Sequence, residues 1–569
     1  MKIKLVNDNI TSDYTKNLLR SRGVDNIDDF LSPSEKNLQS WEDLDNIKLG
    51  VDLVKNTIND KKPYAILIDP DNDGFTSFAI LYQYLKRLNP EKEIEYFVHS
   101  AKQHGLEDTY QIFQDKDYSV VFLPDSSSND GVFAKEINAP ICVIDHHEID
   151  NEPSDNMIVI NNQSSAKYKN KYLSGAGMVW QFCRAMDYYF GHEWAYDYTD
   201  LAAVGICGDA MSGLEIENQY IWSYGFSHIN NFFLKTLIDK QNFSMKGIVN
   251  PTTVAFYISP LLNAVTRVGT TEEKLHMAEA FINGEKLIPS NKKGHKGELV
   301  ALAAEATREC VNAKSRQARI LDNIEEKIDI KINKKDLLIN KVLFVELDDD
   351  DDFPSTLNGL LATRLTNKYS RPTIVARAND DGYIRGSARA IKTENMDSFK
   401  QYLEESEMFE YVLGHPLAFG CSISSYNLDK FFSYSNDSLK DVELGEKCYS
   451  VNFIRDAMDN DIDNLIRDVG EYEYIWSNQN DEPTLYIDNI ILSTNEIQII
   501  GTNRDTVKFT KNGITYIKFK ANELIDELSG MKDIIMKIVG RCNINEWNGI
   551  KNPQIIIDDY EIIDNMYGF

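Results

Sequence analysis

The stretch that decides the fold is Tyr64–Ser77, which reads YAILIDPDNDGFTS. It opens with an apolar run typical of a buried strand, Tyr64–Ile68, and passes through an acidic turn into a helical pattern, Ser77–Leu88. Similar apolar runs that end near acidic residues follow at Val120–Leu123 and Ile141–Ile144. Strands that alternate with helices in this way predict an α/β fold built on a parallel sheet.

Acidic and histidine side chains cluster at the ends of these predicted strands. They are Asp69, Asp71, Asp73, Asp125, Asp145, His146 and His147, and Asp209 follows in a small-residue segment. Side chains at the carboxyl ends of parallel strands converge on one crevice. Carboxylates bind hard divalent cations, imidazole suits Mn²⁺ better than Mg²⁺, and two ions roughly 3.5–4 Å apart stabilise in-line attack at phosphorus. The sequence therefore predicts a two-metal centre.

Each of these features also has an ordinary interpretation. The DxDxDG pattern occurs in calcium loops, a strand-end Asp can cap a helix, and paired histidines are often merely exposed. A calcium loop that began at Asp69 would need a bidentate Glu at its twelfth position, where Ile80 stands. The features occur together, in order, within one predicted sheet, and this favours a catalytic centre.

Composition and charge limit the class of protein. At 569 residues the chain should form several domains. Its 60 Lys and Arg against 89 Asp and Glu give a net charge of −29, the opposite of what is usual for a protein held on nucleic acid. A metal centre concentrates carboxylates, however, and a narrow basic groove can coexist with an acidic exterior. The charge argues against DNA binding without excluding it.

Targeting and redox features predict a cytoplasmic protein. No apolar run approaches the roughly 18 to 20 residues that a membrane-spanning helix requires, and the N-terminal residues lack a secretory signal. The seven cysteines are scattered without a CxxC pair, which predicts neither disulfides nor a zinc site. We therefore expect no membrane partner.

Sequence patterns divide the chain into five expected parts. The apolar spacing over Leu299–Ile328 predicts one long amphipathic helix. A second α/β unit starts at VLFVEL (342–347) and contains an acidic loop, Asp348–Asp352, interpreted as a solvated turn. Short alternating strands after about residue 440 predict a small β-barrel. The parts are an N-terminal helical segment (1–50), a metal-binding catalytic domain (51–270), a connecting helix (271–335), a substrate-gripping domain (336–430) and a nucleic-acid-binding barrel (440–569).

The motifs resemble those of the DHH phosphoesterase superfamily. Asp145-His146-His147 matches the tripeptide that names it, residues 69–77 resemble its DYDxDGxTS motif, and residues 205–209 resemble its small-residue run ending in Asp. Nearly the whole chain is similar to RecJ-like exonucleases, which implies a DHH domain, a DHH-associated domain and an OB-like barrel. The matching stretches are LLRSRGV (18–24), LSGAGMVW (173–180), SPLLNAVTR (259–267), GSARA (386–390), LGHPLAFG (413–420), GRCNINEWNG (540–549) and PQIIIDDYE (553–561).

The resemblance implies a role for each residue of the metal centre. Asp71 would bind the first ion, Asp73 the second, and Asp125 both. His146 and Asp209 would complete the second site, and the ions would be Mn²⁺ or Mg²⁺. The other residues implied in catalysis are Asp145 and His147, with His147 in contact with substrate phosphate.

The resemblance also implies a grip on the substrate. Ser387 and Arg389 of GSARA, with His415 in the turn after Gly414, would hold the scissile nucleotide, and Arg389 and His415 would share in catalysis. Backbone amides of such a turn can approach a phosphate closely. The other implied substrate contacts are Asn263 and Arg267.

Two positions depart from the family pattern. Leu67 stands four residues before Asp71, where many relatives carry a metal-binding His, so Asp69 is a candidate substitute ligand. Leu413 replaces the first glycine of the usual Gly-Gly-His, which should narrow the turn.

A 5′→3′ exonuclease is the implied activity: hydrolysis of single-stranded DNA to 5′-mononucleotides in repair, recombination or replication, with two ions activating water. The partners would be single-stranded DNA and, as further candidates, a single-strand-binding protein or a helicase. Three alternatives stay open: a small-substrate DHH phosphodiesterase acting on oligoribonucleotides, cyclic dinucleotides or pyrophosphate; a non-catalytic single-strand-binding scaffold; and RNA as the main substrate.

One strand of the expected barrel, Ile514–Lys520, has a pattern suited to strand binding. Alternation places Tyr516, Lys518 and Lys520 on one face. An aromatic ring beside two lysines suits base stacking with phosphate attraction, although an ordinary solvated strand face has the same pattern.

Overall fold

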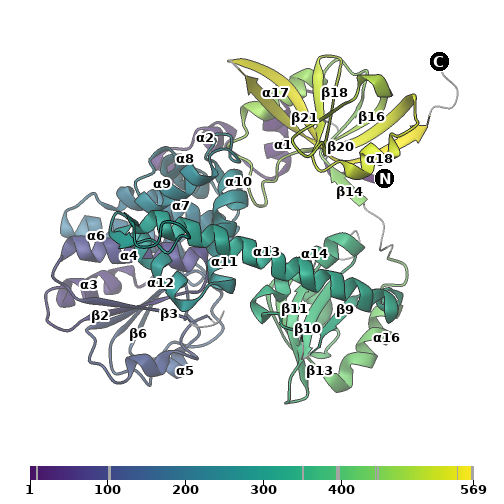
Figure 1. The fold of residues 1–569 in the computed structure, drawn as a ribbon. Coiled ribbons are helices and arrows are strands. Elements are labelled where there is room, and N and C mark those ends of the chain that lie inside the picture. The colour runs from purple at the N-terminus through teal and green to yellow at the C-terminus, as the bar shows by residue number, and fades with distance from the viewer. Residues whose placement is uncertain are drawn as a thin grey trace. The chain divides into compact units, whose positions relative to one another are not determined.

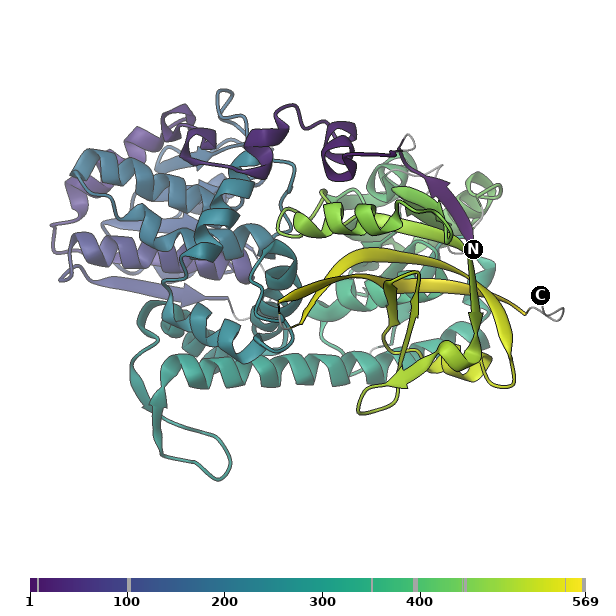
Figure 2. The ribbon, with the colours of Figure 1, turned by 90° about the horizontal axis from the view of Figure 1, so that it is seen from above.

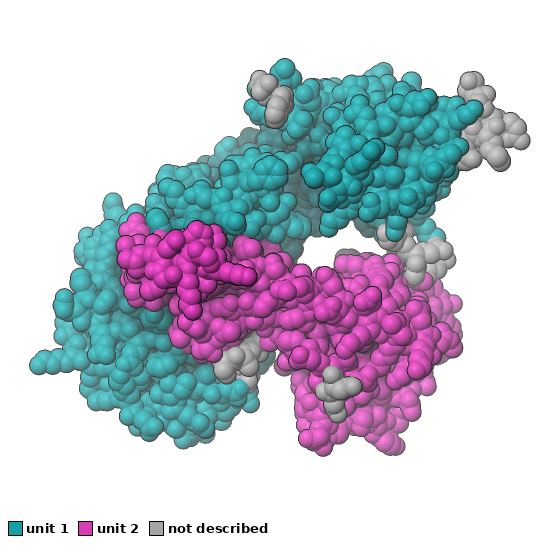
Figure 3. Space-filling model, in the orientation of Figure 1, with its two compact units in different colours: residues 1–97, 105–259, 448–569 teal, residues 98–104, 260–447 magenta. Residues whose placement is uncertain are grey.

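The chain folds into two compact units (Figure 3) in the computed structural model. The first unit comprises residues 1–97, 105–259 and 448–569, and the second comprises residues 98–104 and 260–447. Among the described residues, no helix is both long enough and apolar enough to span a membrane. The described residues are 1–7, 10–99, 104–348, 351–391, 398–442, 444, 448–547 and 549–564.

A five-stranded sheet carries the acidic motifs in the first unit (Figure 1). Its order is β3 (Ile94–Val98), β2 (Tyr64–Ile68), β4 (Val120–Pro124), β5 (Ile141–Asp145) and β6 (Met157–Asn161), and the last four are parallel. Every residue of β2, β4 and β5 is buried, as expected for a parallel sheet covered on both faces. The predicted α/β fold is confirmed.

Helices pack on this sheet and extend the first unit. The side chain of Asp71 caps α4 (Asn72–Leu88) by accepting a hydrogen bond from Gly74 N at 3.0 Å. α4 packs against α6 (Gly175–Phe190) and α7 (Thr199–Gly208). The remaining helices of this region are α3 (Ile47–Thr57), α5 (Gly131–Ala134), α8 (Ile216–Ser227), α9 (Phe232–Gln241), α10 (Pro251–Thr253) and the π-helical turn η5 (Val254–Ile258). The next helix, α11 (Ser259–Val268), belongs to the second unit from residue 260 onward.

A mixed five-stranded sheet forms the second α/β unit predicted from the sequence. Its order is β12 (Phe409–His415), β13 (Ala418–Ser424), β11 (Tyr383–Arg389), β10 (Thr373–Ala378) and β9 (Leu343–Leu347). Only β9 and β10 are parallel among these strands. The helices are α14 (Asn358–Tyr369), which packs on β10 and β11, α15 (Phe399–Glu405) and α16 (Leu428–Ser438). Of the predicted acidic turn, residues 349 and 350 lie outside the described residues.

The expected connecting helix is interrupted by a β-hairpin. α12 (Thr271–Asn283) is followed by β7 (Leu287–Pro289) and β8 (Leu299–Ala301), and α13 runs over Leu302–Lys334. The prediction of one helix from Leu299 is therefore wrong at its start. The intervening sequence contains glycines with φ of +87°, which a helix does not accommodate.

The C-terminal part of the first unit holds a seven-stranded sheet. Its order is β15 (Phe453–Asp456), β16 (Thr484–Ser493), β20 (Asp533–Trp547), β21 (Ile550–Asp564), β19 (Ile514–Lys518), β18 (Thr506–Lys511) and β17 (Gln498–Ile500), with helices α17 (Ile462–Glu471) and α18 (Asn522–Glu527). β20 and β21 are 15 residues each, much longer than the short strands expected there.

The N-terminal residues share a core with this C-terminal sheet. β1 (Lys2–Leu5) pairs in parallel with β14 (Cys448–Val451), and α1 (Tyr14–Ser21) and α2 (Ile27–Leu31) bury side chains among those of the sheet. The expected helical N-terminal segment thus also contains a strand. Its strand partner is separated from it by more than 400 residues, which a local sequence pattern does not reveal.

Candidate metal centre and substrate-binding residues

The predicted metal ligands converge at one edge of the parallel sheet. Asp69 follows β2 directly, Asp125 follows β4, and Asp209 follows the end of α7. His146 Nε2 lies 3.2 Å from Asp125 Oδ1, 3.5 Å from Asp209 Oδ2 and 3.9 Å from Asp73 Oδ2. We call the following six residues the metal cluster: Asp69, Asp71, Asp73, Asp125, His146 and Asp209.

The metal cluster divides into two groups of donor atoms. In one group the donors of Asp73, His146 and Asp209 lie within 4.8 Å of one another, and in the other those of Asp69, Asp71 and Asp125 do so. Asp125 contacts His146 of the first group, so it lies beside both. The donors of Asp125, Asp145, His146 and His147 also lie within 4.8 Å of one another, so the assignment of ligands to two ions stays a prediction.

Backbone geometry places Asp125 close to α6. Asp125 has a φ of 68°, a strained left-handed conformation for a residue other than glycine. A Cβ atom on Gly175 would lie 2.2 Å from Asp125 Oδ1, so only glycine fits at that point of the LSGAG stretch. The N-terminus of α6 also holds Asp73, whose carboxylate accepts hydrogen bonds from Gly175 N at 2.6 Å and Ala176 N at 3.1 Å.

Burial and mutual repulsion disfavour the carboxylate charges of the metal cluster. Burial, reinforced by the other aspartates, raises the pKa of Asp125 and of Asp209 well above its ordinary value. The same causes raise the pKa of Asp73 to about 6. Asp125 Oδ1 is buried and, although it lies 3.2 Å from His146 Nε2, accepts no hydrogen bond from the described residues. Divalent cations would offset the repulsion between the carboxylates and would bind Asp125 Oδ1. The donor set therefore fits such ions.

Asp145 and His147 form an ion pair beside the metal cluster. His147 Nδ1 lies 2.8 Å from Asp145 Oδ1, which also accepts a hydrogen bond from His146 N at 2.7 Å. Desolvation opposes both charges, fully for the buried Asp145 and partly for His147, but the attraction within the pair outweighs it. The pair holds the pKa of Asp145 below its ordinary value and raises the pKa of His147 to about 10. The His147 side chain is 53% exposed. Asp145 therefore positions a cationic, accessible His147.

Leu67 is a core residue. It lies fully buried in β2 and packs with Leu123 and Val143 of the neighbouring strands. The position that carries a histidine in many relatives thus contributes only packing here. Asp69, two residues further on, is grouped with Asp71 and Asp125, which supports its candidacy as the substitute ligand.

The second unit brings Arg267 and Arg389 together. Arg389 ends β11, and its guanidinium packs on α14, where a Cβ on Gly359 would lie 2.5 Å from Nη2. Burial, followed by the charge of Arg267, lowers the pKa of Arg389. Burial and Arg267 likewise lower the pKa of Lys314 on α13. Lys314 therefore joins this basic cluster, and sequence reasoning missed it because nothing local shows which face of a long helix meets Arg267. Asn263 lies one helical turn before Arg267 on α11.

The register of the second sheet aligns the other predicted substrate residues. Ala418 pairs with both Arg389 and His415, so these two lie in one cross-strand row, two strands or roughly 10 Å apart. Gly420 likewise separates Ser387 from Leu413. Because Ala418 and Gly420 are small, no bulky side chain lies between these pairs on this face of the sheet.

Gly414, expected in a turn, is the penultimate residue of strand β12, and the turn follows at residues 416–417. The φ of Gly414 is +131°, and a Cβ there would lie 3.0 Å from the Phe419 side chain, so the position requires glycine. Leu413, which replaces a family glycine, is 64% exposed. The leucine side chain therefore points largely into solvent and does not need space in the core.

The predicted stacking role of Tyr516 is wrong. Tyr516 is 1% exposed and stacks on Phe509 inside the C-terminal core, with ring centroids 4.8 Å apart. The alternation was sound, but the face that carries Tyr516 also carries Ile514 and points into the core. Lys518 donates a hydrogen bond to Asp558 O at 3.0 Å, and Lys520 is exposed beyond the strand, at a φ of 51°. Neither lysine lies beside an accessible tyrosine at position 516.

Loss of the Tyr516 ring should therefore destabilise the protein instead of weakening base stacking. Tyr516→Ala should lower the free energy of unfolding by about 3–5 kcal/mol, because it removes a large buried ring. Phe519→Ala, which changes a ring that is 53% exposed, should cost less than about 1 kcal/mol. Chemical denaturation of both variants measures the difference. A Tyr516→Ala protein of unchanged stability that binds single strands more weakly would restore the stacking role.

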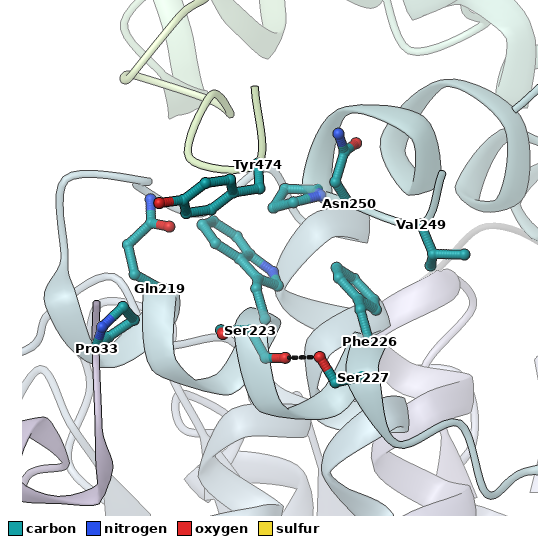
Figure 4. A pocket seen from close by; sticks show the side chains of 10 residues that line it. Pro33, Gln219, Ser223, Phe226, Ser227, Val249, Asn250 and Tyr474 are labelled. Carbon is teal, nitrogen blue, oxygen red and sulfur yellow. Dashed lines mark hydrogen bonds between the residues drawn. The ribbon is translucent and has the colours of Figure 1, made fainter. Parts of the chain in front are cut away.

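A pocket of about 230 Å³ lies elsewhere in the first unit (Figure 4). Trp222 and Phe226 of α8, the 249–251 segment and Tyr474 line it, and Tyr474 Oη donates a hydrogen bond to Leu31 O at 3.0 Å. None of the predicted site residues lines this pocket.

Comparison with known families matches both ends of the first unit. Residues 65–206 match the DHH family, N-terminal domain, and residues 464–559 match the RecJ OB domain. Fold and metal cluster thus define the class, a DHH protein that carries a RecJ-type OB domain.

Full-length relatives narrow this class. The chain is 32% identical over 577 residues to YorK of Bacillus subtilis, named as an SPbeta prophage-derived single-strand DNA-specific exonuclease, covering 99% of this chain and 98% of that protein. It is 24% identical to the single-stranded-DNA-specific exonuclease RecJ of Bacillus subtilis, covering 95% of this chain and 67% of that protein. The crystal structure of RecJ in complex with Mn²⁺ from Thermus thermophilus shares the fold, with a TM-score of 0.72, 16% identity, and coverage of 98% of this chain and 79% of that chain. The chain belongs to the RecJ-like family of DHH exonucleases.

Proposed function

We propose that this protein is a metal-dependent 5′→3′ exonuclease that hydrolyses single-stranded DNA to 5′-mononucleotides. The observation that carries the proposal is the metal cluster, in which His146 contacts Asp125, Asp209 and Asp73 within 3.9 Å. The names of the relatives support the substrate and the reaction. The ions would be Mn²⁺ or Mg²⁺, held by the six residues of the metal cluster.

The protein's own residues would orient the phosphodiester. Bound divalent ions supply activation of water and neutralisation of charge at phosphorus. His147, cationic at neutral pH because its pKa is about 10, would contact the phosphate, while Asp145 fixes its ring. Arg389 and Arg267, together with Lys314, offer a half-buried basic cluster for a phosphate of the terminal nucleotide.

His415 and Ser387 would complete the grip on the nucleotide. His415 shares a cross-strand row with Arg389, and Ser387 lies two residues before Arg389 on the same face of β11. His415→Ala or Arg389→Ala should therefore lower activity without removing the metal ions.

The other candidate functions receive less support. A small-substrate phosphodiesterase would not require the seven-stranded C-terminal sheet that matches the RecJ OB domain. A non-catalytic scaffold would not require all six residues of the metal cluster. We further propose that the protein acts in the cytoplasm, which is supported by seven cysteines that form no disulfide in the described structure. A single-strand-binding protein or a helicase is a candidate partner.

The direction of digestion tests the proposal. Purified protein with Mn²⁺ should release labelled mononucleotide at the earliest times from 5′-labelled single-stranded DNA. The same strand labelled at its 3′ end should yield labelled mononucleotide only late, and a blunt duplex should resist. Early release from the 3′-labelled end would refute the polarity, and equal digestion of a matched RNA strand would refute the preference for DNA.

A further inference from the structure

The hairpin of β7 and β8 carries a concentrated positive charge in a protein of net charge −29. Its tip, residues 291–298, reads NKKGHKGE, and every residue of this stretch is exposed. Lys292, Lys293 and Lys296 all lie within five positions. Figure 2 shows the hairpin projecting beside the start of the long helix α13.

The hairpin is held in place at its base. Glu305 on α13, 2% exposed, accepts hydrogen bonds from Asn291 N at 3.0 Å and Ser290 Oγ at 3.2 Å. Across the hairpin, Ser290 N donates to Glu298 O at 2.8 Å and Gly297 N to Ser290 O at 2.9 Å. A loop that needed only to connect two helices would not require this buried anchor. The lysines are therefore presented from a fixed base.

The charges at the tip are available to a ligand. No described carboxylate lies within ion-pairing distance of Lys292, Lys293 or Lys296, whereas His295 pairs with Glu298 at 3.0 Å. A Cβ on Gly294 or Gly297 would meet no atom within 4 Å, so the outer surface of the tip is open.

An apolar surface lies beside this basic tip. The pairing register places Leu287, Pro289 and Leu299 on one face of the hairpin, and the two leucines are 62% and 66% exposed. The hairpin thus combines exposed lysine charges with an apolar face that can contact sugars or bases.

We propose that the lysine tip of this hairpin binds the phosphate backbone of single-stranded DNA, independent of its sequence, as a contact additional to the metal cluster. The inference rests on the proposed function for the identity of the polyanion. Lysine ammonium groups are compact charges that attract phosphates without selecting a base. In an acidic protein, such a local patch lets a polyanion approach against the overall charge.

Salt-dependent binding tests this contact. In an Asp125→Asn background, which should leave DNA uncut, Lys292→Gln, Lys293→Gln and Lys296→Gln are combined and binding to a fluorescein-labelled thymidine 30-mer is measured by anisotropy. Each lost phosphate contact should lower the slope of log affinity against log salt by about 0.7, or roughly 2 for three lysines. Affinity at low salt should fall at least about tenfold.

The matched control removes the same charge elsewhere in the second unit, with Lys334→Gln, Lys335→Gln and Lys430→Gln, three exposed lysines. It should change neither slope nor affinity. An unchanged slope in the hairpin variant, or an equal loss in the control, would overturn the inference. The inference would also be overturned if the hairpin variant lost binding to polyglutamate but kept its binding to DNA, because the tip would then be a site for an acidic protein. Wild-type protein that neither binds nor cleaves DNA would instead defeat the proposed function.

Discussion

Asp125→Asn should reduce hydrolysis of single-stranded DNA by about 10³-fold or more, because metal ions in such sites contribute several kcal/mol of transition-state stabilisation. Asp125 lies beside both donor groups of the metal cluster, so loss of its charge should weaken both ion sites. Asparagine has nearly the same shape and tolerates the φ of 68° at this position. The loss would therefore report on charge and not on folding.

Two measurements separate this effect from a general defect. Initial rates with Mn²⁺ are compared with those of Asp108→Asn, which removes an exposed carboxylate of the same unit and should retain wild-type activity. Calorimetric titration with Mn²⁺ should show weaker binding only in Asp125→Asn. Near-wild-type turnover by Asp125→Asn would exclude Asp125 from the catalytic centre.

Much of the metal centre could be predicted because it depends on local patterns. Strand ends are visible as apolar runs that stop at polar residues, and parallel topology then forces those ends together. Sequence patterns alone therefore predict that Asp69, Asp125 and His146 lie together. They do not reveal that Gly175 must lack a Cβ to let Asp125 approach, because that contact joins residues 50 positions apart.

Two predictions were wrong because the same sequence pattern is compatible with two structures. Alternation along β19 separates Tyr516 from Ile517, but it does not tell which face meets the core, and the core selected Tyr516. The apolar spacing from Leu299 continues into α13, so the predicted helix wrongly included strand β8 (Leu299–Ala301) at its start. The glycines at 294 and 297 were the available signal against a continuous helix.

Metal binding should stabilise the protein more at neutral pH than at acidic pH. Burial and repulsion raise the pKa of Asp73 to about 6 and place those of Asp125 and Asp209 well above the ordinary value, which is near that of the unfolded chain at about 3.9. A group whose pKa is raised on folding stabilises the metal-free protein while it is protonated. That contribution is complete below the unfolded pKa and is lost as pH rises through about 6. Metal-free protein should therefore carry the greatest carboxylate repulsion near pH 7.5.

Mn²⁺ relieves that repulsion, and protons compete with it below about pH 6. At 100 times its dissociation constant the ion should add about 2.7 kcal/mol at pH 7.5, and the gain should be clearly smaller at pH 5.5. Thermal unfolding with EDTA or with Mn²⁺ at both pH values measures the two increments. Asp125→Asn serves as the control, since it removes one repelling charge and should show a smaller increment at pH 7.5. Equal increments at the two pH values, or a larger one at pH 5.5, would contradict the assignment of these buried aspartates as the metal ligands.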